Sequence, residues 1–347
     1  MTGYKLAHIN DIVLNSMNVI IGSVGLSKYY GCVSPVYYML YPRYENDCVR
    51  YYNYLFQTRE LQYKLKGFGN GIMEIRMRIP MSKLNMVELP IPPYKIQHYI
   101  ADYLDEKCFK IDSIIEKKQL IIEKLKQYRL SVISEMTMDR TNPLISLGKC
   151  IDKLEQGWSP SPTENNQESD WRVLSLAAVK EGKFNKAETK PFIGDENRCE
   201  RLKVKKGDFL LTRSNTREYV GAVSLVDDVF DNTIFSDLIY RIFFNTRFLL
   251  PLFALYYFQS TYARQQIERD AHGSSSTMVK ITHKDIDNWK IYLPSLEKQE
   301  IVLKRLHTLD MAIKSEIDKR TLEINKLTTY KKSLIYEAVT GKKDICL

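Results

Sequence analysis

Residues 123–135 read EKLKQYRLSVISE, and residues 325–337 read NKLTTYKKSLIYE. Both stretches have helical spacing of apolar residues, and the second repeats much of the first at a constant distance. The offset is 326 − 124 = 202 residues, and it pairs Lys124, Leu125, Tyr128, Ser131, Ile133 and Glu135 with Lys326, Leu327, Tyr330, Ser333, Ile335 and Glu337. The chain therefore contains an internal duplication.

The duplication extends well beyond these helical stretches. With the same offset the two halves align without a gap from Ser34 to Glu135, so that SPVYYMLY (34–41) matches SDLIYRIF (236–243). Upstream the offset shrinks to 208 − 11 = 197, and YKLAHINDIVLNSMN (4–18) matches RLKVKKGDFLLTRSN (201–215). A small insertion or deletion between residues 18 and 34 explains the change.

The clearest predicted elements are two long helices. After Pro92-Pro93 and Pro294 the sequence has no proline or glycine until Pro143 and Gly341, so each run allows about 44 helical residues, roughly 65 Å. Steps of four and three residues give a mostly apolar seam in each run. The first seam is Leu104, Cys108, Ile111, Ile115, Lys118, Ile122, Leu125, Arg129 and Val132, and the second is Leu306, Asp310, Ile313, Ile317, Arg320, Ile324, Leu327, Lys331 and Leu334. A lone helix cannot bury such a stripe, so we expect the two helices to pair antiparallel.

The remaining sequence predicts two globular units of mixed structure. KGDFLLTR, NWKIYLP and MEIRMRIP have the apolar content and the glycine or proline borders of strands, whereas residues 248–270 have helical length and period. The predicted fold is α+β, with two mixed α/β units separated by an antiparallel coiled coil and related by a pseudo-two-fold repeat. The expected boundaries are residues 1–90 for the first unit, 91–141 for the first helix, 142–292 for the second unit and 293–347 for the second helix.

Composition narrows the class of protein. The net charge of +9 and the pI of about 9.0 suit a polyanionic partner such as nucleic acid. No run of 18 apolar residues and no secretory signal pattern occur, so we expect a cytoplasmic protein without a membrane span. The six cysteines are scattered without a CxxC pair, which argues against a disulfide framework or a zinc site.

Two motifs resemble catalytic signatures but lack the required chemistry. IPPY (91–94) resembles the (N/D)PPY motif of amino-methyltransferases, but Ile91 cannot accept a hydrogen bond from a target amine. GFGNG (67–71) follows a helical pattern and precedes a strand pattern, which predicts a turn and not a nucleotide loop. The sequence therefore predicts no catalytic residue, cofactor or metal, and a self-contained methyltransferase is disfavoured.

Three polar loops of the second unit are candidates for DNA contact. They are EQGWSPSPTENNQ (155–167), LLTRSNTREYVGAV (210–223) and AHGSSSTMVKIT (271–282). Arginine and asparagine read base edges, while hydroxyls and loop amides bind phosphates. The candidate DNA-binding residues are Trp158, Ser159, Ser161, Arg213, Ser214, Asn215, Thr216, Arg217, Gly273, Ser274, Ser275, Ser276 and Lys280. The structural alternative is that these are ordinary solvated loops. For the aromatic-rich segment 29–56, core packing is favoured over base stacking.

The chain resembles the specificity subunits of type I restriction-modification systems. The resemblance rests on the two heptad helices, on the junctions LPIPPYKIQHYIADYLD (89–105) and YLPSLEKQEIVLKRL (292–306), and on KLTTYKKSLIYEAVTGK (326–342). It implies that each globular unit is a target recognition domain reading half of a split site in double-stranded DNA. It also implies that the helices set the spacing and dock two methyltransferase subunits, which restriction subunits join, and that this subunit is not catalytic.

The first unit departs from the family pattern. The second recognition domain begins near Pro143, whereas Met1 aligns near Arg198, so the first domain lacks a counterpart of about 55 residues of the second. A truncated gene, a mis-set start codon and a partial cassette kept for recombination are alternative explanations. An alternative function is an assembly scaffold that recruits partners without reading DNA.

Overall fold

The structure is a computed structural model that describes residues 3–17, 23–44, 46–68, 78–160, 170–180, 182–273, 278–343 and 345. It divides into two compact units. Unit 1 comprises Met1–Ile122 and Asp318–Leu347, and unit 2 comprises Glu123–Ile317. Each unit therefore contains a globular part together with one stretch of each long helix.

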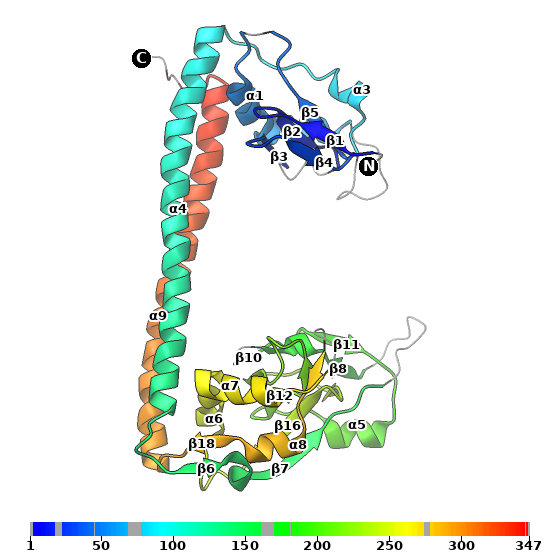
Figure 1. Ribbon diagram of the computed structural model, residues 1–347. Helices are drawn as coiled ribbons and strands as arrows, with labels where there is room; N and C mark the ends of the chain where they lie inside the picture. The colour runs from blue at the N-terminus through cyan, green and yellow to red at the C-terminus, as the bar shows by residue number, and fades with distance from the viewer. Residues whose placement is uncertain are drawn as a thin grey trace. The chain divides into compact units, whose positions relative to one another are not determined.

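The two long helices are present and lie antiparallel. They are α4 (Tyr94–Thr137) and α9 (Leu296–Val339), each of 44 residues, which lie side by side in Figure 1. In unit 1, Asp112 pairs with Lys331 at 2.6 Å. Farther along α4, Lys118 pairs with Glu323, also at 2.6 Å. Because the residue number falls on α9 as it rises on α4, the pairing is antiparallel, and the predicted fold class is confirmed.

The heptad seam is the buried face of the pair. In unit 1, Leu104 and Ile111 of α4 are buried with Leu334 of α9. In unit 2, Ile133 of α4 packs with Leu306 of α9. Three of the four basic seam residues are neutralised across the pair, since each of Lys118, Arg129 and Lys331 reaches an acidic residue of the facing helix. Paired charges at a two-helix seam tolerate partial burial because each desolvated ion keeps a partner.

The described residues of unit 1 form two small sheets and three helices before α4. One sheet has the order β3-β2-β5, and the other pairs β1 with β4. The elements are β1 (Lys5–Ala7), β2 (Ile12–Asn15), β3 (Val24–Leu26), β4 (Gly31–Val33), β5 (Tyr37–Leu40), α1 (Val49–Phe56), α2 (Arg59–Lys66) and α3 (Met81–Leu84). Their apolar faces form a core with the C-terminal turns of α9, including Ile335 and Val339.

Unit 2 is built around the four-stranded sheet β14-β12-β16-β7. A second sheet has the order β11-β8-β15, and β9–β10, β6–β18 and β13–β17 form smaller pairs. The strands are β6 (Leu144–Ser146), β7 (Ile151–Gln156), β8 (Arg172–Leu174), β9 (Val179–Lys180), β10 (Lys183–Phe184), β11 (Thr189–Pro191), β12 (Phe209–Thr212), β13 (Ser214–Asn215), β14 (Val223–Leu225), β15 (Thr233–Phe235), β16 (Ile239–Phe244), β17 (Val279–Lys280) and β18 (Lys290–Tyr292). The helices are α5 (Glu196–Leu202), α6 (Pro251–Gln259), α7 (Thr261–Asp270) and α8 (His283–Asn288), with short 3-10 helices at Leu147–Cys150 and Leu176–Ala178.

Residues 248–270, predicted as helical, form two helices and not one. The chain breaks at Ser260, whose backbone is extended and whose hydroxyl accepts a hydrogen bond from the amide of Ala263. This is the N-cap geometry that starts a new helix. Ser260 is fully buried, so the cap also satisfies a polar group inside the core.

The two units have the same strand register at equivalent positions. Leu14 of β2 stands opposite Tyr38 of β5, and Leu211 of β12 stands opposite Tyr240 of β16. The differences, 211 − 14 = 197 and 240 − 38 = 202, are the two offsets found in the sequence. The strand registers thus confirm both the duplication and the insertion or deletion between residues 18 and 34.

The units differ at one sheet edge. In unit 2 the outer edge of β16 pairs with β7, whereas in the described part of unit 1 the strand β5 pairs with β2 alone. The buried side chain of Arg241 on β16 binds Glu155 of β7 and Asp208, which precedes β12. Its repeat position in unit 1 is Met39, so this ionic network belongs to unit 2 only.

No helix of the described residues is long and apolar enough to cross a membrane.

Candidate nucleic-acid interface

The predicted DNA-binding residues lie on three segments of unit 2. Those that the structure describes lie directly after β7, on the strand β13 and its flanking residues Arg213 to Arg217, and at Gly273 and the strand β17. β13 and β17 pair antiparallel, with Ser214 opposite Lys280 and Asn215 opposite Val279. The fold therefore brings together the Arg213–Arg217 segment and Lys280, which are more than 60 positions apart in the chain.

Arg213 is held in place by its neighbours. Its guanidinium lies 5.6 Å from the ring centre of Tyr240, and its Nη1 donates a hydrogen bond of 3.4 Å to the carbonyl of Asp237. Its Nε is buried and has no hydrogen-bond partner among the residues that the structure describes. Burial raises the pKa of Tyr240, while Arg213 acts in the opposite direction. The ring of His283 also packs on Tyr240, at 4.6 Å between centres. An arginine held over a ring keeps a defined orientation, as the reading of base edges requires.

Asp237 joins the loop after β7 to Arg213. The hydroxyl of Ser159 donates to Oδ1 of Asp237, and the amide of Asp237 donates back to that hydroxyl at 3.3 Å. Because the Asp237 carbonyl also accepts from Arg213, one residue connects two predicted segments. Sequence reasoning missed Asp237, although an acidic residue two positions before the strand β16 was the signal that could have found it.

Gly157 allows the loop after β7 to approach the sheet. A Cβ at this position would lie 2.2 Å from the carbonyl oxygen of Phe235, so a larger residue would force the backbone apart. The next residue, Trp158, donates its amide to that same carbonyl at 2.9 Å. This close contact fixes where Trp158 and Ser159 begin to leave the sheet.

Trp158 is partly exposed and packs against two side chains. Its ring lies edge-on to Phe192 at 6.1 Å, and the guanidinium of Arg198 lies 4.4 Å from its ring centre. Arg198 is exposed at the surface, so it adds a cation beside the indole. The sequence analysis did not select Arg198, because it falls in a helix remote from the three loops in sequence.

The remaining residues of the second segment differ in accessibility. Ser214 is fully buried, and its hydroxyl donates to the carbonyl of Val279 at 3.1 Å, so its side chain supports the loop and does not reach the surface. The Oδ1 of Asn215 accepts from the amide of Thr216 at 2.9 Å. Thr216 and Arg217 are both exposed.

The third segment exposes Gly273 and Lys280. At Gly273 a Cβ would lie 2.9 Å from the carbonyl of Met278, so the two sides of this loop approach closely. Ser161, Ser274, Ser275 and Ser276 lie outside the described residues, as do residues 69–77, which include part of GFGNG and most of the MEIRMRIP strand pattern.

The described part of the chain has no group of three or more His, Cys, Asp or Glu side chains that could hold a metal ion. The candidate face instead combines exposed or half-buried cations with an indole, hydroxyls and a histidine. Cations and hydroxyls bind phosphates, and an oriented arginine binds base edges. This set of groups is suited to binding nucleic acid.

The comparisons with known proteins point to one family. The model of the "Type I restriction modification DNA specificity domain" matches residues 160–326. The type I restriction enzyme EcoKI specificity subunit of Escherichia coli (strain K12) is 25% identical over 282 residues, which cover 76% of this chain and 59% of that protein. The MjaVIII specificity subunit of Methanocaldococcus jannaschii is 23% identical over 323 residues, covering 84% and 69%.

A solved structure shares the fold. It is a chain from work described as the structural basis underlying complex assembly and conformational transition of the type I R-M system. The TM-score is 0.74 at 13% identity, and the match covers 98% of this chain and 84% of that one.

Proposed function

We propose that this chain is the DNA sequence-recognition subunit of a type I restriction-modification complex and has no catalytic activity of its own. The specificity-domain model that matches residues 160–326 and the similarity to two type I specificity subunits support the proposal. The substrate of this chain is double-stranded DNA with a bipartite site. Its partners are methyltransferase subunits, two per chain, and the restriction subunits that join them. It holds no cofactor, since methyl transfer and cleavage belong to the partners.

The observation that carries the proposal is the convergence of three loops on one face of unit 2. Arg213 is oriented by Tyr240 and by the carbonyl of Asp237, and Asp237 also holds Ser159. Lys280 lies on the strand paired with β13. We propose that Arg213 reads a base edge and that Lys280 and Ser159 contact the backbone, because a held guanidinium can discriminate bases while a free ammonium acts as a point charge.

The same face defines which predicted residues are proposed as contacts. Trp158, Thr216, Arg217 and Gly273 are at least partly exposed beside it, and Arg198 joins them as a further cation. Ser214 is left out because its hydroxyl is buried and occupied.

Docking of two copies of one partner is supported by a repeated exposed surface on the long helices. In unit 1, Tyr99 is 50% exposed and Phe109 is 74% exposed on α4. In unit 2, their repeat positions on α9, Ile301 and Met311, are 45% and 58% exposed. Large apolar side chains kept at the surface at equivalent positions are typical of protein interfaces. Because the pair occurs once in each unit, we propose two equivalent sites for methyltransferase subunits.

The outward direction of these side chains separates them from the helix seam. At about 100° per residue, Phe109 lies about 80° from Tyr99 around α4, whereas the seam residue Leu104 lies about 140° away on the other side. Leu104 is fully buried in the unit 1 core. The exposed residues therefore take no part in the pairing of α4 with α9.

Base modification in cells provides the test. Methylome sequencing would compare a strain carrying the wild-type gene with strains carrying Arg213→Ala, Lys280→Ala or the control Arg247→Ala. Arg247 is an exposed arginine that follows the other end of β16, away from Tyr240. We expect Arg213→Ala to change or relax the modified sequence, by about 1–3 kcal/mol of discrimination at one base pair. We expect Lys280→Ala to lower the extent of modification without changing the sequence, and Arg247→Ala to match the wild type. An unchanged modified sequence in Arg213→Ala together with an unchanged extent of modification in Lys280→Ala would refute the proposal and favour a scaffold that does not read DNA.

A further inference from the structure

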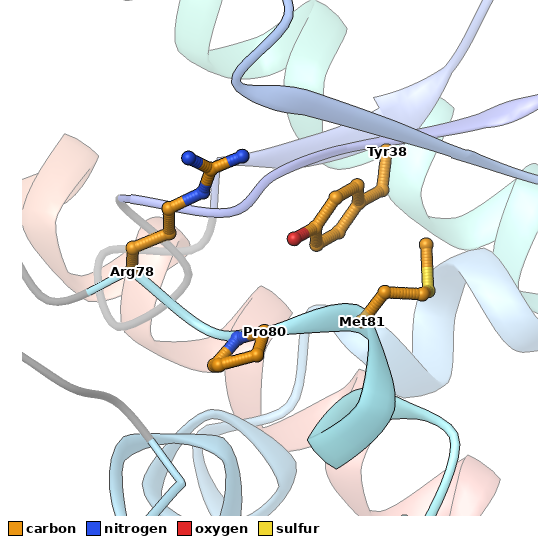
Figure 2. A pocket seen from close by; sticks show the side chains of 4 residues that line it. All are labelled: Tyr38, Arg78, Pro80 and Met81. Atoms are coloured by element: carbon orange, nitrogen blue, oxygen red, sulfur yellow. The ribbon is translucent and has the colours of Figure 1, made fainter.

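Unit 1 has a surface pocket in which a single arginine stands beside a buried tyrosine. The pocket is lined by Tyr38, Arg78, Pro80 and Met81 (Figure 2). Figure 2 shows the guanidinium of Arg78 and the ring of Tyr38 on the same side of the Arg78–Met81 segment. Arg78 is exposed and pairs with no acidic side chain among the residues that the structure describes, whereas Tyr38 is only 7% exposed. The positive charge of Arg78 is therefore available to a ligand.

The backbone of this pocket matches the candidate interface of unit 2. The hydroxyl of Tyr38 donates to the carbonyl of Ile79 at 3.0 Å, and that of Tyr240 donates to the carbonyl of Ile281 at 3.4 Å. Both tyrosines and both isoleucines differ by 202 positions. Arg78 therefore occupies in unit 1 the place that Lys280 occupies in unit 2.

A second pair of hydrogen bonds fixes the same segment in both units. The amide of Ile79 donates to the carbonyl of Ser16 at 3.0 Å, and the amide of Ile281 donates to that of Arg213 at 2.9 Å. Ser16 thus stands at the position of Arg213. The equivalence of the two sites therefore rests on matched hydrogen bonds to two different segments and not on the sequence alignment alone.

The side chains at these matched positions are not equivalent. Ser16 is fully buried and its hydroxyl donates to the carbonyl of Val36, so unit 1 has no counterpart of the oriented arginine. Met81 replaces His283. Among the described residues Arg78 has neither the ring contact nor the carbonyl hydrogen bond that hold Arg213, and the cation over the ring of Tyr38 is Lys5, at 4.8 Å. Arg78 therefore offers a charge without a fixed direction. Such a group suits a phosphate, which needs charge, better than a base edge, which needs orientation.

We propose that Arg78 contacts a DNA backbone phosphate, so that unit 1 binds DNA at this pocket without reading sequence through it. This inference rests on the proposed function, since it assumes that the face around Arg213 and Lys280 binds DNA. The two equivalent sites then have different roles. The site around Arg213 and Lys280 in unit 2 selects a sequence, and the site around Arg78 in unit 1 adds affinity.

Fluorescence anisotropy with the full chain and its methyltransferase partner would test the proposal. Labelled duplexes with the mapped site and with a scrambled site would be titrated across a salt series. We expect Arg78→Ala to weaken binding to both duplexes by a similar factor, about 5- to 10-fold at 0.1 M salt, and to reduce the slope of log K against log salt by about 0.9, as for one lost phosphate contact. Arg78→Lys should retain most of the affinity because a phosphate needs only the charge.

The matched control is Arg59→Ala, an exposed arginine at the start of α2 that removes the same charge elsewhere on unit 1. Affinity unchanged in Arg78→Ala, or an equal loss in Arg59→Ala, would overturn the proposal. So would a loss confined to the mapped site that lysine does not rescue, which would show base reading. Thermal unfolding of each variant separates these outcomes from misfolding, and Arg78→Lys supplies the test if the alanine variant does not fold. Failure of the proposed function itself would show separately, as unchanged site choice in Arg213→Ala.

Discussion

Arg129 of α4 and Asp310 of α9 form a two-point ion pair within unit 2, with Nε 2.6 Å from Oδ1 and Nη2 3.1 Å from Oδ2. The hydroxyl of Tyr256 also donates to Asp310, at 2.8 Å, and burial raises the pKa of that tyrosine. The repeat places Cys108 where Asp310 stands. In unit 1 the equivalent cation, Lys331, therefore pairs one turn away, with Asp112.

The first prediction concerns these two ion pairs. Asp310 is 26% exposed and holds three partner groups, whereas Asp112 is 56% exposed and holds one. We expect Asp310→Asn to lower the free energy of unfolding by about 1–3 kcal/mol, because it leaves a half-buried arginine without its counter-ion. The matched change Asp112→Asn should cost less than about 1 kcal/mol. Urea unfolding of the two variants checks the difference, and equal costs would contradict it.

The second prediction concerns two glutamines whose hydrogen bonds hold each long helix against its globular unit. The buried Gln299 accepts from the amide of Leu250 and donates to the carbonyls of Phe248 and Pro294. We expect Gln299→Leu to lower the free energy of unfolding by about 2–4 kcal/mol, because these backbone groups lose their partner away from water.

Its repeat partner Gln97 provides a graded comparison. Among the described residues two backbone groups depend on it, the amide of Cys48 and the carbonyl of Pro92, against three for Gln299, and its side chain also hydrogen-bonds with Tyr52. Gln97→Leu should therefore cost less, about 1–3 kcal/mol. Gln127→Leu, at an exposed position of α4, serves as the control and should be nearly neutral. A larger loss from Gln127 than from Gln299 would be inconsistent with this account.

The third prediction concerns pH. Burial alone would raise the pKa of Glu155, but hydrogen bonds from Lys153 and Arg241 lower it below its ordinary value of 4.5. A carboxylate with a lowered pKa in the folded state stabilises the protein above its ordinary pKa, and this stabilisation is lost as the pH falls through the folded value. Glu155→Gln should therefore be less stable than the wild type at pH 7, and the difference should shrink as the pH falls below about 4.

Urea unfolding at pH 7 and at pH 3.5 to 4 measures this effect. The control is Glu188→Gln, an exposed glutamate at the start of the β11 region, for which the stability difference should be small at both pH values. A Glu155→Gln deficit that grows toward acid would reverse the expected sign and disprove the role given to the network around Arg241.

The fourth prediction concerns partner docking. Phe109→Ser in unit 1 and Met311→Ser in unit 2 each remove a large apolar side chain that is exposed in this chain. If each helix face docks one methyltransferase subunit, either single variant should bind one copy tightly and one weakly, and the double variant should bind both weakly. We expect about 1–3 kcal/mol of binding free energy per site.

Native mass spectrometry or analytical ultracentrifugation of the mixed proteins gives the stoichiometry. Ile193→Ser, at a residue 49% exposed on the loop before α5, is the control and should retain two copies. Loss of both copies from one single substitution would argue against two independent sites.

The sequence by itself determined the duplication and the pairing of the two long helices. The apolar seam of residues such as Leu104 and Leu306 predicted both long helices, because a stripe of period 3.5 is stable only when it is buried against another. The two offsets of the repeat recur in the strand registers, because equivalent positions of the two units pair in the same way. These features depend on short-range periodicity, which can be recognised in the order of residues.

Only the tertiary structure decided which polar residues share the candidate face. Asp237 joins Ser159 to Arg213, and Arg198 stacks on Trp158, through contacts between segments that no local pattern connects. The fold also buries Ser214 and exposes Thr216, although both lie in one polar run. The physical reason is that strand pairing decides which side chains of a loop are turned inward, and that pairing involves partners such as Lys280 more than 60 residues away.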